Sequence, residues 1–283
     1  MSPRWNRSVR LQVGRDAVAA VARAGWPRAV VVARARRAVE AGAAHAQAVE
    51  AVLQDLAAQT PLAGARLEAE IASALLHLDV VEGDFGGRTD RQLQGIAAAC
   101  VAEMLGDDAA RCAVRWHLQR DDRHLLVAAI AQDWLDLLQS AAKSAGLRLA
   151  SVAPEFVVRW NACGGATKPG DGVFAVCAAT DLAIAAVADG AVAAISVGAA
   201  VDLGAAQSRP EPPATAAASR VAAAGFSPDR RAMATVDERV DRFLCGRGQD
   251  PAAQSAFVLV AADEPAVAAS ARWSVRPSRE MRA

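Results

Sequence analysis

The sequence predicts an α/β protein with two related halves. Two runs of three short strands carry this prediction, one at Val9–Val13, Ala17–Ala22 and Arg28–Val32, and one at Val173–Cys177, Leu182–Val187 and Val192–Val197. Segments with the apolar periodicity of helices follow each run, and strands that alternate with helices favour an α/β architecture. The return of the opening pattern favours a duplication. A chain of 283 residues is long enough for two lobes.

After the first run of strands, the first half continues with a helix, a strand and a second helix. Apolar residues spaced i, i+3, i+4 and i+7 within 49–56 predict one buried helix face. A strand is expected at Leu67–Ile71, and further strand-like alternation follows at Leu75–Val81. Thr89 and Gln92 form a capping-box pattern, which predicts the start of the second helix. Its inner face is expected to hold Leu93, Ile96, Ala97, Cys100 and Met104.

Three strands and a helix complete the predicted first half. Arg111–Leu118 alternates as a half-buried strand does, and Leu125–Ile130 is a continuous apolar run typical of a strand covered on both faces. A helix at Gln132–Ala145 is expected to stop at the glycine that follows it. The next strand, Leu147–Val152, is expected to end before Pro154.

The second half contains the second run of strands, then a helix and two more strands. Ser227 and Pro228 suit the N-cap and the first turn of a helix that ends at Gly246. Phe257–Ala261 and Val267–Val275 are expected to pair as a hairpin near the end of the sequence.

The hydrophobic segment Leu182–Val201 has the length of a membrane span. An aspartate near its middle, Asp189, makes insertion unfavourable by about 2.5 to 3.5 kcal/mol. Asp-Gly between alternating apolar runs is also a strong hairpin signal. We therefore expect two strands joined by a turn at Asp189 and Gly190, and no membrane span.

Charge and cysteine content bear on the partners and the compartment. The 31 basic and 31 acidic residues balance, so no net positive charge favours nucleic acid as a partner. The five cysteines are widely spaced and form no Cys-x-x-Cys pair, and the N-terminal residues do not follow a signal-peptide pattern. These features predict reduced thiols and a cytoplasmic location.

Two patterns resemble a phosphate loop and a metal site. In Gly164–Gly170 the lysine is followed by proline, whereas a phosphate loop needs Ser or Thr at the start of a helix, so a linker is the better interpretation. His77 and Asp79 share one face of a strand, with Glu82 and Asp84 nearby, but nothing fixes a third metal ligand. A half-exposed strand explains them.

Other reactive side chains also have ordinary interpretations. Asp121–His124 is interpreted as a solvated surface turn, and Cys163 and Cys177 as small buried thiols. The common signatures of hydrolases, zinc proteases and dinucleotide-binding proteins are absent from the sequence. We therefore predict no catalytic, cofactor-binding or metal-ligating residue.

Two parts of the sequence resemble a known family. The run Leu125–Ile130, the helix after it and the segment Ser144–Pro154 resemble the corresponding part of the PilM and GspL proteins of type IV pilus and type II secretion machines. The second run of strands, with its Asp189-Gly190 turn, resembles the start of their second lobe. The resemblance covers roughly residues 8–200. It implies a degenerate form of the two-lobed actin-like fold of the ASKHA class, with ribonuclease H-like topology.

The resemblance also implies how the chain is divided. It predicts a first lobe at 1–162 with an inserted subdomain at about 75–145, a linker at 163–171 and a second, reduced lobe at 172–283.

The actin-like family binds ATP through two strand-turn-strand loops, each with an aspartate for the magnesium shell and a glycine for close approach to phosphate. In the first loop Gly14 is kept, but Gln12 stands where the aspartate would be. In the second loop, at 176–180, both are missing. Magnesium prefers carboxylate or carbonyl oxygens, and an alanine Cβ blocks the approach that glycine permits. We therefore expect no cofactor and no ATP hydrolysis.

The function that the resemblance implies is that of a non-catalytic scaffold. Such a scaffold holds the cytoplasmic tail of a single-span inner-membrane assembly protein and recruits a secretion or pilus ATPase, so it is peripheral to the membrane through its partners. We expect an apolar cleft between the lobes to accept an extended or helical segment. The alternatives are an active actin-like ATPase or small-molecule kinase with misaligned loops, and an adaptor of unrelated α/β fold.

Overall fold

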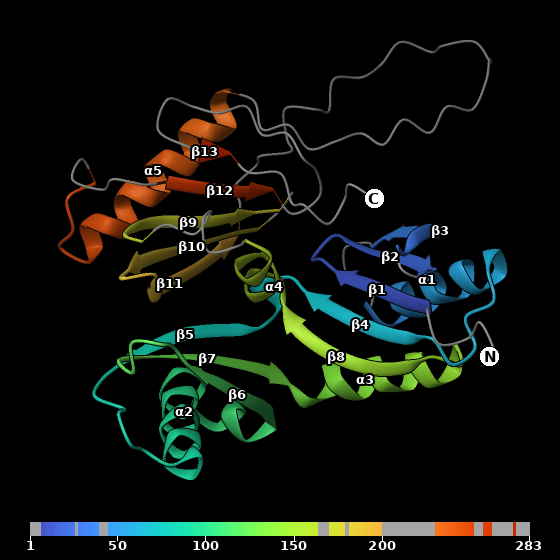
Figure 1. The fold of residues 1–283 in the computed structure, drawn as a ribbon, viewed down its shortest axis with the longest axis horizontal. Helices are drawn as coiled ribbons and strands as arrows, with labels where there is room; N and C mark the ends of the chain where they lie inside the picture. The colour runs from blue at the N-terminus through green and yellow to red at the C-terminus, as the bar shows by residue number, and fades with distance from the viewer. Residues whose placement is uncertain are drawn as a thin grey trace.

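Figure 1 shows the computed structural model, which describes residues 7–25, 28–39, 45–163, 170–178, 181–199, 230–251, 257–261 and 274–275. In chain order, its elements are β1 (Arg7–Val13), β2 (Ala17–Ala24), β3 (Val30–Ala38), α1 (His45–Gln59), β4 (Arg66–Ile71), η2 (Ser73–Leu75), β5 (His77–Glu82), α2 (Asp90–Leu105), η3 (Gly106–Arg111), β6 (Cys112–Leu118), β7 (His124–Ala131), α3 (Gln132–Ser144), β8 (Arg148–Pro154), α4 (Glu155–Ala162), β9 (Gly172–Cys177), β10 (Asp181–Ala188), β11 (Ala191–Ala199), α5 (Arg230–Gly246), β12 (Phe257–Ala261) and β13 (Ser274–Val275). Most of the predicted linker and the predicted start of the last helix at Ser227 and Pro228 lie outside the described residues.

The first sheet has the strand order β3-β2-β1-β4-β8. β1, β2 and β3 are antiparallel neighbours, whereas β4 and β8 run parallel to β1. Helices α1 and α3 contribute buried residues to the core on one face of this sheet. That core includes Val9, Leu11, Leu53, Leu67 and Leu138. The strands predicted for this half are confirmed, and β3 extends beyond Val32 because the Ala-Arg alternation continues to Ala38.

The second sheet repeats this arrangement with strands from the second half. Its order is β11-β10-β9-β12-β13, with β9, β10 and β11 antiparallel and with β12 and β13 parallel to β9. Helix α5 packs on one face through Val236, Val240 and Leu244, all of which are buried. The two five-stranded sheets therefore share one topology.

The last two strands differ from the prediction. β12 and β13 pair in parallel, with Val258 opposite Ser274 and Leu259 opposite Val275, so the predicted hairpin is wrong. A two-residue turn joins antiparallel strands only, whereas parallel neighbours need a connection of roughly a dozen residues. The sequence between the two strands, 262–273, is long enough for that connection.

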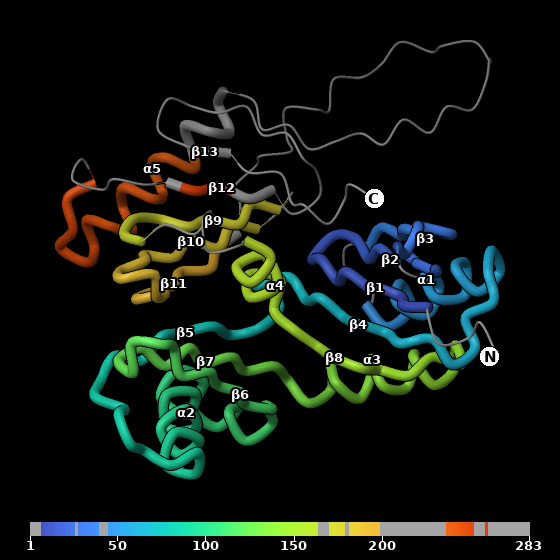
Figure 2. Tube along the Cα trace, viewed as in Figure 1, coloured from blue at the N-terminus to red at the C-terminus, as the bar shows by residue number. Residues whose placement is uncertain are grey.

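A smaller sheet is formed between β4 and α3, where Figure 2 shows the chain leaving the first sheet and returning to it. Its order is β5-β7-β6, and both pairings are antiparallel. Helix α2 covers one face, so that Leu93, Ala97 and Val101 pack with Leu125 and Val127 in a core of their own. The domain boundaries implied by the resemblance stay predictions. Helix α3, which falls inside the range of the predicted insertion, belongs to the core of the first sheet.

Helices α2 and α4 differ in part from what the sequence predicts. The capping box of Thr89 and Gln92 is present at the start of α2, as predicted. Met104, expected on the inner face of α2, is 41% exposed, and Val101 is buried instead. Helix α4 was not predicted, because Pro154 was interpreted as a break. Pro154 ends β8 and is the N-cap residue of α4, a place where proline's missing N–H loses no hydrogen bond.

The turn at Asp189 and Gly190 joins β10 to β11, as predicted. Both residues have positive φ, 51° and 73°, the pattern of a two-residue hairpin turn. The helices of the described residues include none that is both long and apolar enough to cross a membrane. All five cysteines are free thiols.

Candidate functional site

A small cavity lies between the β1–β2 turn and the β9–β10 turn, where the two halves face each other. Its volume is about 50 Å³, whereas pockets for drug-sized ligands have roughly 300–1,000 Å³. Charged and polar side chains line it together with small apolar residues; they are Gln12, Asp16, Arg36, Glu70, Glu155 and Asp181. As the described residues bound it, the cavity has room for a few water molecules.

The centre of this charged cleft is Glu70 on β4, which is 4% exposed. Its carboxylate lies 3.0 Å from Arg10 Nε and 3.3 Å from Arg159 Nη2, and it accepts a hydrogen bond of 3.4 Å from Gln12 Nε2. Arg159 on α4 is 2% exposed and lies 3.7 Å from Glu155. A buried carboxylate needs such partners, because an unpaired charge away from water is strongly destabilising. These contacts join β1, β4 and α4 through side chains.

Asp181 faces this cluster from the start of β10, on the other half of the molecule. It is buried, and Arg15 Nη1 approaches its Oδ1 to 3.7 Å. Neither carboxylate oxygen has a hydrogen-bond partner among the described residues. Burial raises the pKa of Asp181 to about 6; Arg15 opposes this rise and Asp16 adds to it. The second half therefore places a poorly solvated acid opposite the first turn.

Backbone groups of both turns bond within the turns themselves. Gly14 N–H donates to Ala17 O at 2.8 Å, and Ala178 N–H donates to Asp181 O at 2.8 Å. A Cβ at Gly14 would lie 3.0 Å from Ala17 O, so the tight turn itself explains the glycine. These two amides are thus not directed at an anion in the cleft, and the acidic lining opposes a polyphosphate. Residues 179 and 180 of the second loop lie outside the described residues.

The metal pattern of the sequence does not assemble into a site. Asp79 accepts hydrogen bonds from Val80 N at 2.8 Å and from Cys100 Sγ at 3.5 Å, and Glu82 pairs with Arg123. His77 is exposed. Among the described residues, no group of three His, Cys, Asp or Glu side chains is arranged to hold a metal ion.

The turn at Asp121–His124 is less exposed than predicted. His124 begins β7, is 9% exposed and bonds through Nδ1 to the Asp121 carboxylate. Asp121 also accepts from the backbone N–H groups of Arg123 and His124. Burial tends to raise the pKa of Asp121, but these hydrogen bonds outweigh it and lower the pKa below its ordinary value. Cys177 is buried as predicted, and Cys163 is half-buried.

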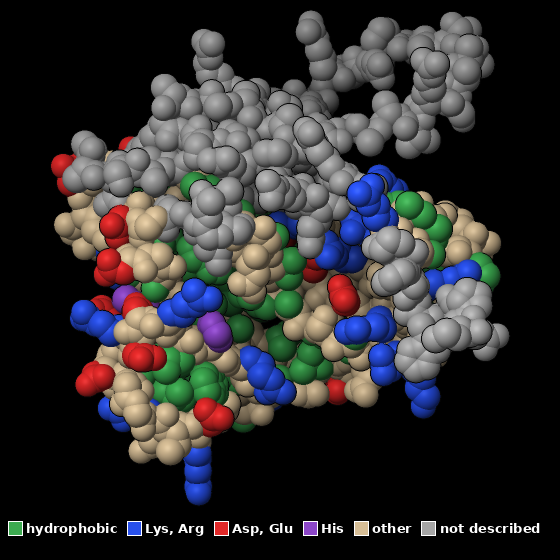
Figure 3. Space-filling view, viewed as in Figure 1, with side chains coloured by type: hydrophobic (Ala, Val, Ile, Leu, Met, Phe, Trp, Pro, Cys, Tyr) green, Lys and Arg blue, Asp and Glu red, His purple; other side chains and the backbone are tan. Residues whose placement is uncertain are grey.

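An apolar groove of about 240 Å³ lies between the three-stranded sheet and the first sheet. In Figure 3 a hollow bordered by hydrophobic side chains is visible at the centre of the face, where β7 and β8 run in Figure 1. Ten described residues line the groove: Leu76, Ala113, Arg115, Ala128, Ala129, Ile130, Leu135, Val152, Ala153 and Pro154. Arg115 is the one charged residue among them.

Two edge strands border this groove. β8 is the last strand of the first sheet and β6 the last of the three-stranded sheet, so among the described residues each has one side without a neighbouring strand. On β6, Arg115 Nη1 already donates to the Val114 carbonyl at 2.9 Å. β8 is therefore the better edge for main-chain pairing with an added segment.

The apolar groove does not lie where the sequence analysis expected it. The cleft between the halves was expected to be apolar and to accept a partner, but the described cleft is charged and nearly filled. The apolar groove lies within the first half, beside the three-stranded sheet. Because side chains from strands far apart in sequence build it, no local pattern in the sequence marks its residues.

A glutamine that the sequence analysis missed joins the three-stranded sheet to the second sheet. Gln119 Nε2 donates to Val192 O at 2.6 Å, and Val192 N donates to Gln119 Oε1 at 2.7 Å. Its side-chain amide thereby occupies the backbone groups of one residue on the edge strand β11. Glu70 was also missed, although alternation within Leu67–Ile71 places Glu68 and Glu70 on one face of β4.

No protein-family model and no curated protein matches the chain. Solved structures do. The cytoplasmic domain of EpsL, an inner-membrane component of the type II secretion system of Vibrio cholerae, aligns over 96% of this chain and 90% of its own, with 13% identity and a TM-score of 0.55. A PilM–PilN type IV pilus biogenesis complex aligns over 90% and 80%, with 13% identity and a TM-score of 0.59.

A third structure carries the fold in its description. It is a Bacteroides thetaiotaomicron protein with an actin-like ATPase fold and unknown function, and it aligns over 93% of this chain and 83% of its own, with 7% identity and a TM-score of 0.55. At these identities the likeness shows the fold alone. The actin-like ATPase fold predicted from the sequence resemblance is confirmed.

Proposed function

We propose that this protein is a non-catalytic scaffold of a type IV pilus or type II secretion assembly platform, on the cytoplasmic side of the inner membrane. The observation that carries the proposal is the apolar groove beside the edge strand β8, in a fold shared with EpsL and PilM. The proposed partner is an inner-membrane protein whose cytoplasmic tail binds in this groove.

The groove suits an extended tail. Main-chain pairing with β8 holds a strand in register, and alternate apolar side chains of that strand enter the space between Ala128, Ile130 and Val152. Arg115 at the rim favours an acidic residue on the tail. A few apolar anchors of this size are sufficient for micromolar binding, which suits a platform that assembles and disassembles.

The charged cleft supports the absence of catalysis. Glu70 and Arg159 occupy the region where the halves meet, and the two described turn amides bond within their own turns. An active actin-like ATPase or small-molecule kinase remains the second candidate function, because the fold itself hosts such activities. An assembly ATPase is the second partner we expect, and no described surface singles out its binding site.

Site-specific crosslinking in the native host tests the groove. A photoreactive residue in place of Ala128 should crosslink to the cytoplasmic tail of a single-span membrane protein, identified by mass spectrometry. The same residue in place of Ala98, which is exposed on α2, is the matched control and should not. Crosslinks of equal yield at both positions, or none to a membrane protein, would contradict the proposed groove.

Calorimetric titration with Mg-ATP tests the absence of nucleotide binding. We expect no saturable heat at millimolar nucleotide, since the described residues of the cleft leave a cavity of about 50 Å³ and the two described turn amides bond within their own turns. A magnesium-dependent isotherm with one site, or phosphate release by the purified protein, would support the ATPase or kinase instead. The two experiments are independent, so that failure of one does not decide the other.

A further inference from the structure

The balanced charge of the whole chain conceals a basic segment. Residues 1–39 contain nine arginines and a single acidic residue, Asp16, so that the rest of the chain carries the compensating negative charge. Of this segment, 7–25 and 28–39 are described, and they form β1, β2 and β3 of the first sheet. Arg10, Arg15 and Arg37 lie against Glu70, Asp181 and Asp55, and the other arginines of the segment give this part of the fold a local positive potential.

The sheet pairing places Arg34 and Arg36 on the face opposite the helices. Ala20, Ala22 and Ala33 belong to the core under α1, so their neighbours along the strands point the other way. Arg34 lies opposite Val21 and Arg36 opposite Ala19 in the β2–β3 pair, and both arginines are exposed. In Figure 3 blue side chains gather over this region of the first sheet.

Two apolar side chains accompany the arginines on the edge strand β3. Val30 is 55% exposed and Val32 is 45% exposed, and Met104 is the other large hydrophobic residue exposed to this extent among the described residues. Arg28, just before the strand, is exposed as well. Guanidinium groups next to exposed valines match a surface that offers phosphate groups with apolar chains directly beneath them.

The strand edge itself is not open to an added protein strand. Gln59 Nε2 donates to the Arg34 carbonyl at 3.0 Å, and Arg37 forms a two-bond pair with Asp55, at 2.7 and 2.9 Å. Both contacts come from α1 and cover the edge of β3. The outward side chains at the start of β3 stay accessible, and such a surface patch suits a planar partner better than a single extended chain.

We propose that the basic face, defined by Arg28, Val30, Val32 and Arg34 at the start of β3, binds the surface of an anionic phospholipid bilayer. The arginines bind the lipid phosphates, and the valines enter the boundary with the acyl chains. This contact goes beyond the proposed tail binding. It gives the protein its own affinity for the membrane and sets which side of the scaffold faces the lipid.

Vesicle co-sedimentation of the full chain tests the proposal. The probes are phosphatidylcholine vesicles with about one third phosphatidylglycerol, and vesicles of phosphatidylcholine alone. We expect binding to the anionic vesicles only, with loss of binding when salt rises from about 0.1 M to about 1 M. The double variant Arg28→Gln, Arg34→Gln should weaken binding about tenfold or more. Val32→Ser should weaken it less and leave the salt dependence unchanged.

A matched control removes the same charge elsewhere. The double variant Arg91→Gln, Arg111→Gln changes exposed arginines on α2 and η3, and should bind as the wild type does. Circular dichroism confirms that each variant is folded. Equal binding to neutral vesicles, equal losses in the two double variants, or equally tight binding to duplex DNA at the same salt would overturn the proposal. The tail-crosslinking result does not depend on any of these outcomes.

Discussion

The two five-stranded sheets share a strand order but differ in what covers their second face. β1 and β9 can be compared by aligning their last residues, Val13 and Cys177. The positions that face the helices are then apolar in both strands, and Leu11 is equivalent to Ala175. The other face does not match, because Arg10 stands where the second sheet has Phe174. The first sheet exposes arginines there, whereas the second buries aromatic side chains.

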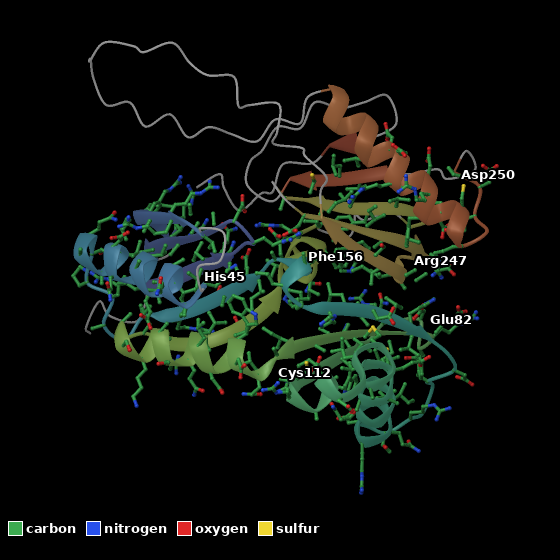
Figure 4. All side chains as sticks on the ribbon, turned by 180° about the vertical axis from the view of Figure 1, so that it is seen from behind. His45, Glu82, Cys112, Phe156, Arg247 and Asp250 are labelled. Carbon is green, nitrogen blue, oxygen red and sulfur yellow. The ribbon has the colours of Figure 1, made fainter. Side chains whose placement is uncertain are left out.

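The reason for the difference lies in the neighbours of each sheet. The second sheet is covered on that face by α4 and by residues of β5, so β9 is buried along its whole length. Figure 4 shows Phe156 where α4 meets the second sheet. The first sheet has α4 only at its Glu70 end, and the outward side chains of β3, Val30, Val32, Arg34 and Arg36, are exposed. The shared topology thus accounts for the face of each sheet that the helices cover. Whether the second face is also covered depends on the tertiary neighbours of the sheet.

The largest effect is expected at the buried face of the second sheet. Phe174 is fully buried and packs edge-to-face against Phe156 and Trp160, with ring centres 5.7 and 5.0 Å apart. Phe174→Ala should lower the free energy of unfolding by about 3–5 kcal/mol in urea titrations. Val32→Ala on the open face of the first sheet should change it by less than about 0.5 kcal/mol. Similar losses for both would remove the contrast between the sheets.

Removal of the Glu70 carboxylate should lower the free energy of unfolding nearly as much. Glu70→Gln removes the carboxylate between Arg10 and the buried Arg159, and should destabilise the protein by about 3 kcal/mol. Glu68→Gln on the same strand is the control and should cost under about 1 kcal/mol. A Glu70 effect no larger than the Glu68 effect, measured by the same titration, would mean that the cluster does not hold β1, β4 and α4 together.

Removal of the Gln119 side chain, which links the three-stranded sheet to the second sheet, should cause an intermediate loss of stability. Gln119→Ala leaves the N–H and C=O of Val192 without partners and should destabilise the protein by about 2 kcal/mol. Hydrogen exchange at the Val192 amide should accelerate, whereas the control Gln139→Ala on the exposed side of α3 should leave it unchanged. Unchanged exchange in Gln119→Ala would argue that the small sheet is not fixed to β11.

The smallest effect is expected at Asp181, and it should depend on pH. Because burial raises the pKa of Asp181 to about 6, the folded protein keeps this proton to a higher pH than the unfolded chain, whose value is near 3.8. Stability should therefore fall as pH rises from about 4 to about 6. Asp181→Asn removes this loss and should stabilise the protein by about 1 kcal/mol at pH 8 but hardly at pH 4. A gain in melting temperature that is constant with pH would contradict this assignment.

Local patterns predicted most of the secondary structure, and their failures have physical causes. The capping box at Thr89 and the Asp189-Gly190 turn are short-range signals, and the structure has both. Helix α4 was missed because a proline that breaks one element also starts another. The final hairpin was wrong because two apolar segments do not reveal whether they pair directly or through a longer connection.

The candidate sites were less predictable than the fold. Alternation in Leu67–Ile71 pairs Glu68 with Glu70, but nothing in the sequence shows that Glu70 would be buried against an arginine 89 residues away. The apolar groove combines β6, β7, α3 and β8, and its lining residues, four of which are alanines, form no distinctive pattern in the sequence. The basic segment at 1–39 is visible in the sequence, yet the whole-chain balance of charge hides it.

The sequence by itself determined the strands, most helices and the two related halves, because these depend on short-range periodicity and on turn residues. Only the tertiary structure decided which face of each sheet is covered, where Glu70 and Asp181 meet the opposite half, and which edge strands stay open beside the groove. These features depend on side chains from distant segments that share one space. Burial and pairing across such distances follow from packing of the whole molecule, and no local pattern encodes them.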